Sequence, residues 1–303
     1  MHMDVLTDEG RRDMLFPEGE NMEIMKLNHE KVLSILPDRD INAHKGDFGK
    51  LLLLCGSEGY TGAAALASVG ALRCGAGLVY LGVPRSIYAI EAVKLTEPIV
   101  FPLPDRDGML SVEALPKILS MLPGMDAVLV GPGLGQSEGT RAVIRAVLEA
   151  AKCPVVLDAD GINGISRHMD ILRERHHPTV LTPHAGEFAR IGGKTDGNKQ
   201  EAAAAFAREY GCILLLKGHD TVVTDGCQCY CNPTGNPGMA VGGSGDVLAG
   251  MITGLIGQGL DPLSAAACGA WLHGAAGDLC AKELGQYAML PTDMLEMLPR
   301  LLK

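Results

Sequence analysis

The chain has 303 residues, 47% of them hydrophobic, which is enough to bury the core of one large domain. A formal net charge of −10, with no block of Lys and Arg, argues against a nucleic-acid-binding protein. No apolar run reaches the roughly 18 residues that a membrane span needs, and the mixed, acidic N-terminus does not read as a secretory signal. The sequence therefore predicts a soluble, cytoplasmic protein whose nine cysteines are reduced.

Residues 1–45 are charged, rich in Met and almost free of Gly, and Pro17 and Pro37 interrupt them. We expect two short helical pieces and a connector here, not an independent domain. From Gly46 onward the sequence repeats the order strand, Gly-rich turn, helix. In chain order it predicts a strand at 51–55, a helix at 63–74, strands at 78–83 and 127–130, a helix at 139–151, strands at 154–157 and 179–181, a helix at 199–210, a strand at 212–216, a hairpin of strands 221–224 and 228–231, and helices at 247–258 and 263–282.

The predicted strands are continuous apolar runs, as expected for parallel strands that are buried on both faces. Their alternation with helices favours an α/β fold with a mostly parallel, doubly wound sheet. Polar and Gly residues concentrate just after the carboxyl ends of these strands. Since ligands of open α/β sheets bind in the crevice at that edge, the loops there hold the candidate site residues.

The residues just before the predicted helix at 247–258 read Gly-Gly-Ser-Gly-Asp. Successive glycines let backbone N–H groups point at one anion, and a helix N-terminus adds partial positive charge. A plain helix-dipole partner would explain Asp246 alone, but not the small residues beside it. We therefore expect an anion hole from the backbone of Gly243, Ser244 and Gly245, with the Asp246 carboxylate as base.

Two further loops follow predicted strands. Lys217 comes directly after the strand at 212–216 and is either a solvated edge charge or a ligand for a nucleotide phosphate. The run at 182–187 reads Thr-Pro-His-Ala-Gly-Glu, where a fixed turn before a helix start favours a directed His184. Glu187 is interpreted as a cap of that helix in preference to a group beside a metal-bound phosphate.

Other motifs give weaker evidence of function. The run Gly-Pro-Gly-Leu-Gly at 131–135 lacks the dinucleotide-binding spacing and reads as a tight turn that lets a ligand approach the backbone. Asp158, Asp160 and Asn163 either form turns or line the crevice, and the sequence leaves both readings open. There is no Gly-x-x-x-x-Gly-Lys-Ser/Thr loop.

Three alternating cysteines, Cys227, Cys229 and Cys231, would share one face of a strand. A metal site is conceivable, but no second pair of ligands with zinc spacing accompanies them. We interpret them as small apolar side chains on a strand.

Together these motifs resemble those of the ADP- or ATP-dependent NAD(P)H-hydrate dehydratases, whose fold is ribokinase-like. The motifs lie, in order, at residues 36–39, 44–49, 56–64, 131–135, 158–160, 182–187, 217–221, 232–235 and 243–246, with His-Gly-Ala at 273–275. The resemblance implies a three-layer α/β/α sandwich with a central, mostly parallel sheet. Ser244 stands where Thr is commoner in the family, and the hydroxyl is kept.

The same resemblance implies a division of the chain into an extension at 1–30 and a dehydratase domain at 31–303. In many relatives an NAD(P)H-hydrate epimerase domain precedes this one. Thirty residues cannot hold that domain, so we expect it to be absent here. Because homotetramers are usual in the family, the resemblance also implies a homotetramer.

By position, the resemblance implies that the hydrated dinucleotide contacts Ala63, Gly133, His184 and Asp246. It implies that the adenine nucleotide contacts Lys217, Gly218, His219, Asp220, Thr221 and Gly245. ADP or ATP would donate a phosphoryl group to the C6 hydroxyl of NAD(P)H hydrate with Mg²⁺ as cofactor, and phosphate would then be eliminated. No residue is assigned as a metal ligand.

Three alternatives stay open at this point. A sugar or small-alcohol kinase of the same fold, such as a hydroxyethylthiazole kinase, shares the Gly-x-Gly-Asp motif and its base. A non-catalytic nucleotide-binding protein is disfavoured by the intact Asp246 and anion hole. A Rossmann dehydrogenase is disfavoured by the missing fingerprint.

Overall fold

The computed structural model describes residues 24–194 and 196–303, and the structural statements below concern these residues. The strands of the main sheet are β1 (Ile24–Met25), β2 (Lys50–Leu54), β3 (Leu78–Pro84), β4 (Ile99–Leu103), β7 (Ala127–Val130), β8 (Val155–Leu157), β9 (Thr179–Leu181), β10 (Ile213–Leu216), β11 (Thr221–Thr224) and β12 (Cys229–Asn232). Their order is β1-β12-β11-β10-β9-β8-β7-β2-β3-β4. All neighbours are parallel except the two pairs that include β11.

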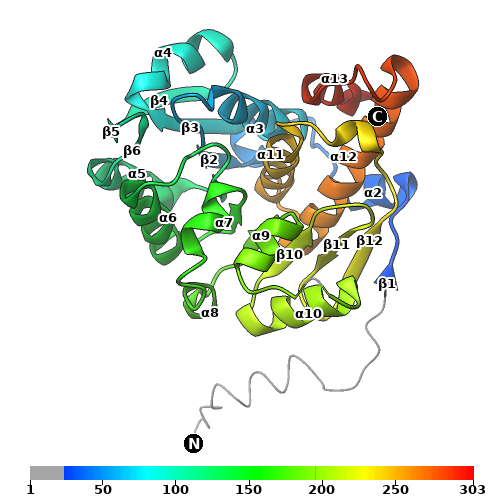
Figure 1. Cartoon of the computed structure of the whole chain (residues 1–303). Helices are drawn as coiled ribbons and strands as arrows, with labels where there is room; N and C mark the ends of the chain where they lie inside the picture. The colour runs from blue at the N-terminus through cyan, green and yellow to red at the C-terminus, as the bar shows by residue number, and fades with distance from the viewer. Residues whose placement is uncertain (1–23, 195) are drawn as a thin grey trace, which may run out of the picture.

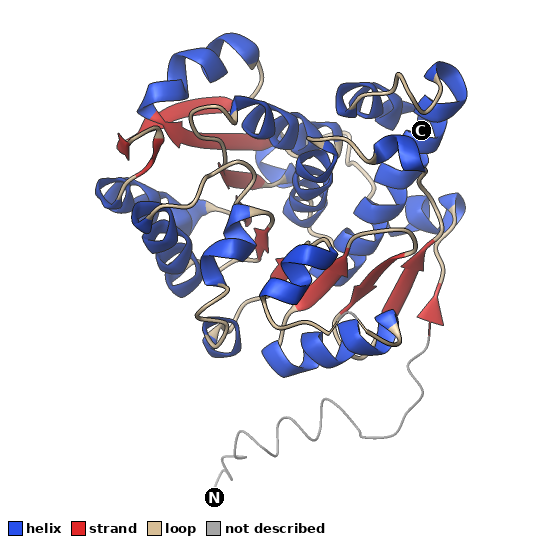
Figure 2. Ribbon diagram, viewed as in Figure 1, coloured by secondary structure: helices blue, strands red, loops and turns tan. Residues whose placement is uncertain are grey.

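Helices cover both faces of this sheet, as Figures 1 and 2 show. One layer packs α2 (His29–Ile35), α3 (Thr61–Arg73), α11 (Ser244–Gly257), α12 (Pro262–Leu284) and α13 (Pro291–Leu301). The other packs α5 (Leu115–Met121), α6 (Glu138–Ala150), α7 (Asp160–Ile165), α8 (Ile171–Glu174), α9 (Ala185–Arg190) and α10 (Lys199–Tyr210). The helix α4 (Arg85–Lys94) lies against β3 and β4 at the sheet's edge.

Short elements complete the described chain. They are the ribbon of β5 (Asp105–Arg106) with β6 (Met109–Leu110) and the 3₁₀ turns η1 (Lys45–Phe48), η2 (Val112–Ala114), η3 (Leu122–Gly124) and η4 (Pro237–Met239).

The central strands are apolar throughout because both of their faces are covered. In β2, Leu51 and Leu53 enter the core beneath α3 and α11, whereas Leu52 and Leu54 enter the core beneath α5 and α6. Since alternate side chains of a strand point to opposite faces, a continuous apolar run is what a sandwiched strand requires. The predicted three-layer α/β/α class is confirmed.

Helices α3 and α11 approach closely over small residues. A Cβ added to Gly250 would lie 2.0 Å from the carbonyl oxygen of Ala67, and one added to Gly254 would lie 2.5 Å from that of Ala71. Only glycine permits this contact between the two helix backbones. The contact fixes α11 across the sheet, with its N-terminus at the edge where β8 and β10 end.

The structure adds to the sequence prediction at the chain's beginning. Of the two short helical pieces expected before residue 46, one corresponds to α2, whereas η1 begins only at Lys45; residues 1–23 lie outside the described residues. Strand β1, however, falls within the segment 1–30 and pairs in parallel with β12, at the edge of the sheet opposite to β4 (Figure 1). The domain boundary drawn at residue 31 stays a prediction.

The cysteine run needs one correction. Strand β12 begins at Cys229, so Cys227 lies in the hairpin turn and does not share a strand face with the other two. The turn is held by Asp225, whose Oδ1 accepts from the amides of Cys227 and Gln228. Within the described ranges, no group of three or more His, Cys, Asp or Glu side chains is arranged to hold a metal ion. No helix in these ranges is long and apolar enough to cross a membrane.

Candidate functional site

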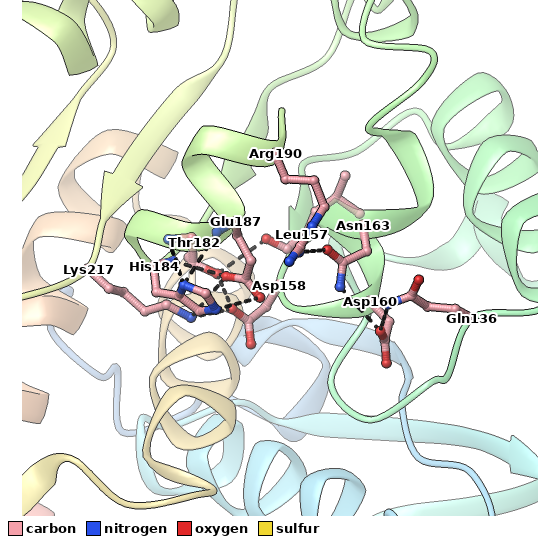
Figure 3. Close-up of polar contacts among 11 residues, drawn as sticks. Gln136, Leu157, Asp158, Asp160, Asn163, Thr182, His184, Glu187, Arg190 and Lys217 are labelled. Carbon is pink, nitrogen blue, oxygen red and sulfur yellow. Dashed lines mark hydrogen bonds and ion pairs between the residues drawn. The ribbon is translucent and has the colours of Figure 1, made fainter. Parts of the chain in front are cut away.

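A buried polar cluster marks the carboxyl edge of three adjacent strands. Asp158 follows β8, Thr182 follows β9 and Lys217 follows β10. The Lys217 ammonium and the Thr182 hydroxyl both donate to Oδ1 of Asp158, each at 2.8 Å (Figure 3). The side chain of Asp158 is 2% exposed and that of Lys217 is 20% exposed, so the ammonium reaches the surface from a buried anchor.

The charge of Lys217 is secured by its neighbours. Burial acts to lower the pKa of Lys217, but the carboxylates of Asp158, Glu187 and Asp246 outweigh it and the pKa is raised. Oε2 of Glu187 lies 4.0 Å from the ammonium. The ammonium of Lys217 is therefore protonated at neutral pH, in the midst of these carboxylates.

The turn after β8 directs two carboxylates in different directions. Ala159 between them has φ 47° and ψ −113°, a conformation that is strained for a residue with a Cβ. On one side of it Asp158 meets Lys217. On the other side Asp160 accepts from the amide of Gly135 at 2.8 Å and from the side chain of Gln136 at 3.2 Å (Figure 3). Such strain is typical of functional sites, where surrounding structure compensates for its cost.

Asp246 lies in the first turn of α11, whose N-cap Gly243 has φ 97°. Among the described residues, none donates a hydrogen bond to its carboxylate. Burial raises the pKa of Asp246 to about 6, Asp158 adds to the rise, and Lys217 opposes it. A half-buried carboxylate with open oxygens and a pKa near neutrality is suited to accept a proton from a bound alcohol.

One of the three amides predicted to form the anion hole is already bonded to the protein. The amide of Ser244 donates to the carbonyl of Val241 at 3.3 Å. In the described chain, the amides of Gly243, Gly245 and Asp246 have no acceptor, as expected for the first turn of a helix. A Cβ on Gly245 would lie 3.3 Å from the Lys217 ammonium, so that cation stands beside the open amides.

A cavity of about 1000 Å³ opens beside this turn. It brings together every predicted nucleotide contact, namely Lys217, Gly218, His219, Asp220, Thr221 and Gly245. His184 and Ser244 also line it, together with the loop 232–237 and the apolar side chains of Met239, Leu248 and Ala270. Its size and its mixture of apolar walls and convergent donors match a small-molecule site.

His184 and Glu187 form a reciprocal helix cap. Nδ1 of His184 accepts from the amides of Gly186 at 3.0 Å and Glu187 at 3.3 Å, while the Glu187 carboxylate accepts from the amide of His184 at 2.9 Å. The predicted capping role of Glu187 is confirmed. Because Nδ1 is the acceptor, a ring proton is assigned to Nε2, which lies 3.6 Å from Oε1 of Glu187, and the 59% exposed ring lines the cavity.

Ala63 and Gly133, the other predicted substrate contacts, lie together outside this cavity. A Cβ on Gly133 would lie 2.8 Å from that of Ala63 and 2.9 Å from that of Tyr60. Gly133 belongs to the same turn as Gly135, which bonds Asp160. The Ala63–Gly133 contact is therefore joined to the turn after β8 through Gly135 and Asp160, whereas the cavity is lined by Lys217 and Gly245.

Some site residues were not predicted. The sequence left Asp158 as either a turn former or a crevice residue, and it did not single out Thr182 as its donor. The available signal was position, because both residues directly follow buried strands. His273 was noted only as part of a motif, yet its ring lies 3.3 Å from the Ser244 hydroxyl on the cavity wall. Burial lowers the pKa of His273 to about 4, so this imidazole is neutral.

Comparison with known sequences identifies relatives over most of the chain. Residues 51–300 match the family model described as NAD(P)H-hydrate dehydratase. The bifunctional NAD(P)H-hydrate repair enzyme Nnr of Moorella thermoacetica is 48% identical over 277 residues, 89% of this chain and 52% of that protein. The ADP-dependent (S)-NAD(P)H-hydrate dehydratase of Bacillus subtilis is 35% identical over 288 residues, 93% of this chain and 99% of that protein. The chain thus spans about half the length of its bifunctional relatives.

Solved structures that resemble this chain include members of the same family. An ADP/ATP-dependent NAD(P)H-hydrate dehydratase from Bacillus subtilis, co-crystallized with ATP/Mg²⁺, is 33% identical with a TM-score of 0.78, covering 90% of this chain and 96% of that chain. A ribokinase-like superfamily protein from Enterococcus faecalis, 26% identical, has the same TM-score over 94% of this chain and 98% of that chain. The ribokinase-like architecture implied by the sequence motifs is confirmed.

Proposed function

Because the chain belongs to the NAD(P)H-hydrate dehydratase family, we propose that it restores the S epimer of NADH or NADPH hydrate to the intact dinucleotide, using a phosphoryl group of ADP or ATP. The product set makes it a carbon–oxygen lyase in metabolite repair. The observation that carries the proposal is the setting of Asp246. Its open carboxylate, with a pKa of about 6, lies beside unpaired amides and the Lys217 cation.

The chemistry follows from the leaving group. Hydroxide leaves poorly from carbon, whereas phosphate leaves well. Asp246 accepts the proton of the C6 hydroxyl as that oxygen bonds to the terminal phosphorus and the bond to the nucleotide breaks. The lone pair of the ring nitrogen then expels phosphate, and loss of a proton from the adjacent ring carbon restores the double bond.

The protein's part in the first step is mostly electrostatic. The amides of Gly243, Gly245 and Asp246 and the ammonium of Lys217 surround the place where charge develops on the transferred group. Asp158 and Thr182 hold that ammonium in position. Such preorganised donors need no rearrangement when the reaction occurs.

The two regions beside this centre fit the two reactants. We place the adenine nucleotide in the cavity lined by residues 217–221 and Gly245. The hydrated dinucleotide is placed along Ala63 and Gly133, with its ring at Asp246. His184, predicted for the same reactant, lines the nucleotide cavity, so it would contact the dinucleotide only where the two reactants meet. This arrangement brings the donor phosphate and the acceptor hydroxyl together at the N-terminus of α11.

Mg²⁺ fits the site as an ion carried by the nucleotide. The described residues form no cage of three ligands, and Mg²⁺ is commonly held by phosphate oxygens and waters with one or two carboxylates. Oδ2 of Asp158 faces Gly245, 4.0 Å from where its Cβ would stand, and would be one carboxylate oxygen able to assist. When bound, the ion neutralises charge on the phosphate oxygens. The homotetramer and the cytoplasmic location stay predictions; light scattering after size exclusion tests the first.

The test mixes the protein with hydrated NADH, Mg²⁺ and either ADP or ATP, and follows the near-ultraviolet absorbance of reduced nicotinamide. We expect the absorbance to recover with release of phosphate and with one nucleotide preferred. A stable phosphorylated alcohol without phosphate release would instead support the kinase alternative. No nucleotide-dependent recovery with either donor would refute the proposal.

A further inference from the structure

The nucleotide loop, residues 217–221, has its carbonyl groups tied back to the protein. The hydroxyl of Thr221 donates to the carbonyl of Gly218 at 2.9 Å. The ammonium of Lys199 donates to the next two carbonyls, that of His219 at 3.2 Å and that of Asp220 at 2.9 Å. Three consecutive carbonyls are thus occupied.

The amides of the same residues have no protein acceptor. Across residues 24–194 and 196–303, no acceptor is bonded to the backbone N–H of Gly218, His219 or Asp220. The backbone is also held in an uncommon form, with φ 143° at Gly218 and φ 55° at Asp220, which has a Cβ. Successive free amides in such turns form concave sites for anionic or strongly polar groups, and this loop lines the cavity.

Lys199 belongs to another element, and its side chain contacts the loop without lining the cavity. It is the first residue of α10, and the N-cap Asn198 fixes that helix end by accepting from the amides of Gln200 and Glu201. A Cβ on Gly218 would lie 3.5 Å from the Lys199 ammonium, so the cation lies close under the loop. Its hydrogen bonds go to backbone oxygens, and Lys199 does not line the cavity.

We propose that Lys199 is a positioning residue for nucleotide binding. By holding the carbonyls of His219 and Asp220, it keeps the peptide units of the loop turned so that their amides donate to the adenine nucleotide. The inference rests on the proposed nucleotide site and adds a residue that does not itself touch the ligand. An ammonium that bonds two carbonyls of a strained turn would otherwise have no role beyond local stability.

The experiment compares Lys199→Met and Lys199→Arg with Lys117→Met, which removes an exposed lysine on α5. ADP binding is measured by calorimetry without the dinucleotide, and turnover is measured with it. For Lys199→Met we expect the Kd and KM for the nucleotide to rise about tenfold, the cost of one charge-assisted hydrogen-bond pair, with kcat unchanged within about twofold. Lys199→Arg, which keeps a charged donor, should recover part of the affinity.

Hydrogen exchange separates positioning from general stability. The amides of residues 218–220 should exchange faster in Lys199→Met, while those of β10 and β11 keep their wild-type protection. Unchanged nucleotide affinity in a folded Lys199→Met, or an equal loss in Lys117→Met, would overturn the inference and leave the proposed function intact. Should Lys199→Met not fold, Lys199→Gln is judged by the same criteria. Wild-type protein that binds ADP but restores the dinucleotide with neither ADP nor ATP would refute the proposed function alone.

Discussion

Lys217 and Asp158 form a 2.8 Å ion pair that joins the ends of β10 and β8 across the intervening strand β9, whose following residue, Thr182, donates to the same carboxylate oxygen. Three strands therefore determine where one ammonium stands. Gly245 at the start of α11 has no side chain to separate that ammonium from the helix amides. The pair links the sheet to the open amides at the start of the helix, so we expect it to serve both stability and binding.

The stability losses from removing the two members of this pair should not add. Asp158→Asn removes the nearest counter-charge of an ammonium that is 20% exposed, and we expect a loss of about 3 kcal/mol in the free energy of unfolding. Lys217→Met leaves a carboxylate that is 2% exposed and should cost a similar amount. The double variant should lose less than the sum. Urea unfolding of the four proteins measures this coupling, and additive losses would contradict it.

Asp246→Asn should remove turnover while keeping the fold. The amide cannot accept the hydroxyl proton, so we expect kcat to fall by about 10² to 10⁴-fold. ADP affinity should change little, because the amides of Gly243 and Gly245 remain. Asp293→Asn, at the start of α13, is the matched control for a carboxylate in a first helical turn. Near wild-type turnover in Asp246→Asn would rule this residue out as the base.

The pH dependence of the wild-type protein reports the same group. Asp246 must be ionised to act as a base, so kcat/KM should rise with pH through about 6. The effect on stability has the opposite sign: with the folded pKa raised above 3.8, the ionised carboxylate opposes folding as pH rises through 6. Asp246→Asn should therefore be more stable than wild type at pH 8 by about 1 kcal/mol. An activity profile that is flat between pH 5 and pH 7 would contradict the assignment.

The sequence predicted the sheet well because its strands are buried on both faces. Continuous apolar runs such as those in β2 and β7 have few alternative structures once Gly-rich turns bound them. The segment between β3 and β7 was left unassigned. Its helix α4 and strand β4 lie at the sheet's edge, where one side faces solvent, so charged residues and Pro102 interrupt the apolar pattern.

The site was predicted in part for a related reason. Asp246 and the glycines before it are adjacent in sequence, so local pattern predicts them. The pairing of Asp158 with Lys217, and the support of the nucleotide loop by Lys199, join residues 59 and about 20 positions apart. Such contacts depend on strand order and helix placement, which a single sequence read by itself does not specify.

A buried carboxylate away from the site offers a test of stability. Glu91 on α4 is fully buried, and neither oxygen has a hydrogen-bond partner among the described residues. Its nearest cation, Lys94, lies 3.6 Å away and donates instead to the Thr61 hydroxyl. Burial raises the pKa of Glu91, and Lys94 opposes the rise only in part.

Glu91→Gln should therefore stabilise the protein at neutral pH. A carboxyl pKa that is raised by folding contributes stability below the unfolded pKa and loses it as pH rises. We expect the free energy of unfolding of the variant to exceed that of wild type by about 1 kcal/mol at pH 8. At pH 4 the difference should be little or nothing, because the buried Glu91 side chain is then uncharged, as Gln is. Chemical unfolding at the two pH values measures the difference. A destabilised variant at pH 8 would show that the Glu91–Lys94 attraction outweighs the burial of charge.

Gly133→Ala should weaken binding of the dinucleotide specifically. The new methyl group would lie 2.8 Å from the Cβ of Ala63, at a backbone φ of 63° that disfavours a side chain. The turn must shift to relieve this contact, and Gly135 would then displace its partner Asp160. We expect the KM for the hydrated dinucleotide to rise about tenfold, with the Kd for ADP unchanged, since Gly133 does not line the nucleotide cavity.

Gly259→Ala is the matched control, because Gly259 also has a positive φ of 94° but has no atom within 4 Å of the added Cβ. If both variants raise this KM equally, backbone strain alone is responsible and the contact between Gly133 and Ala63 does not shape the substrate site.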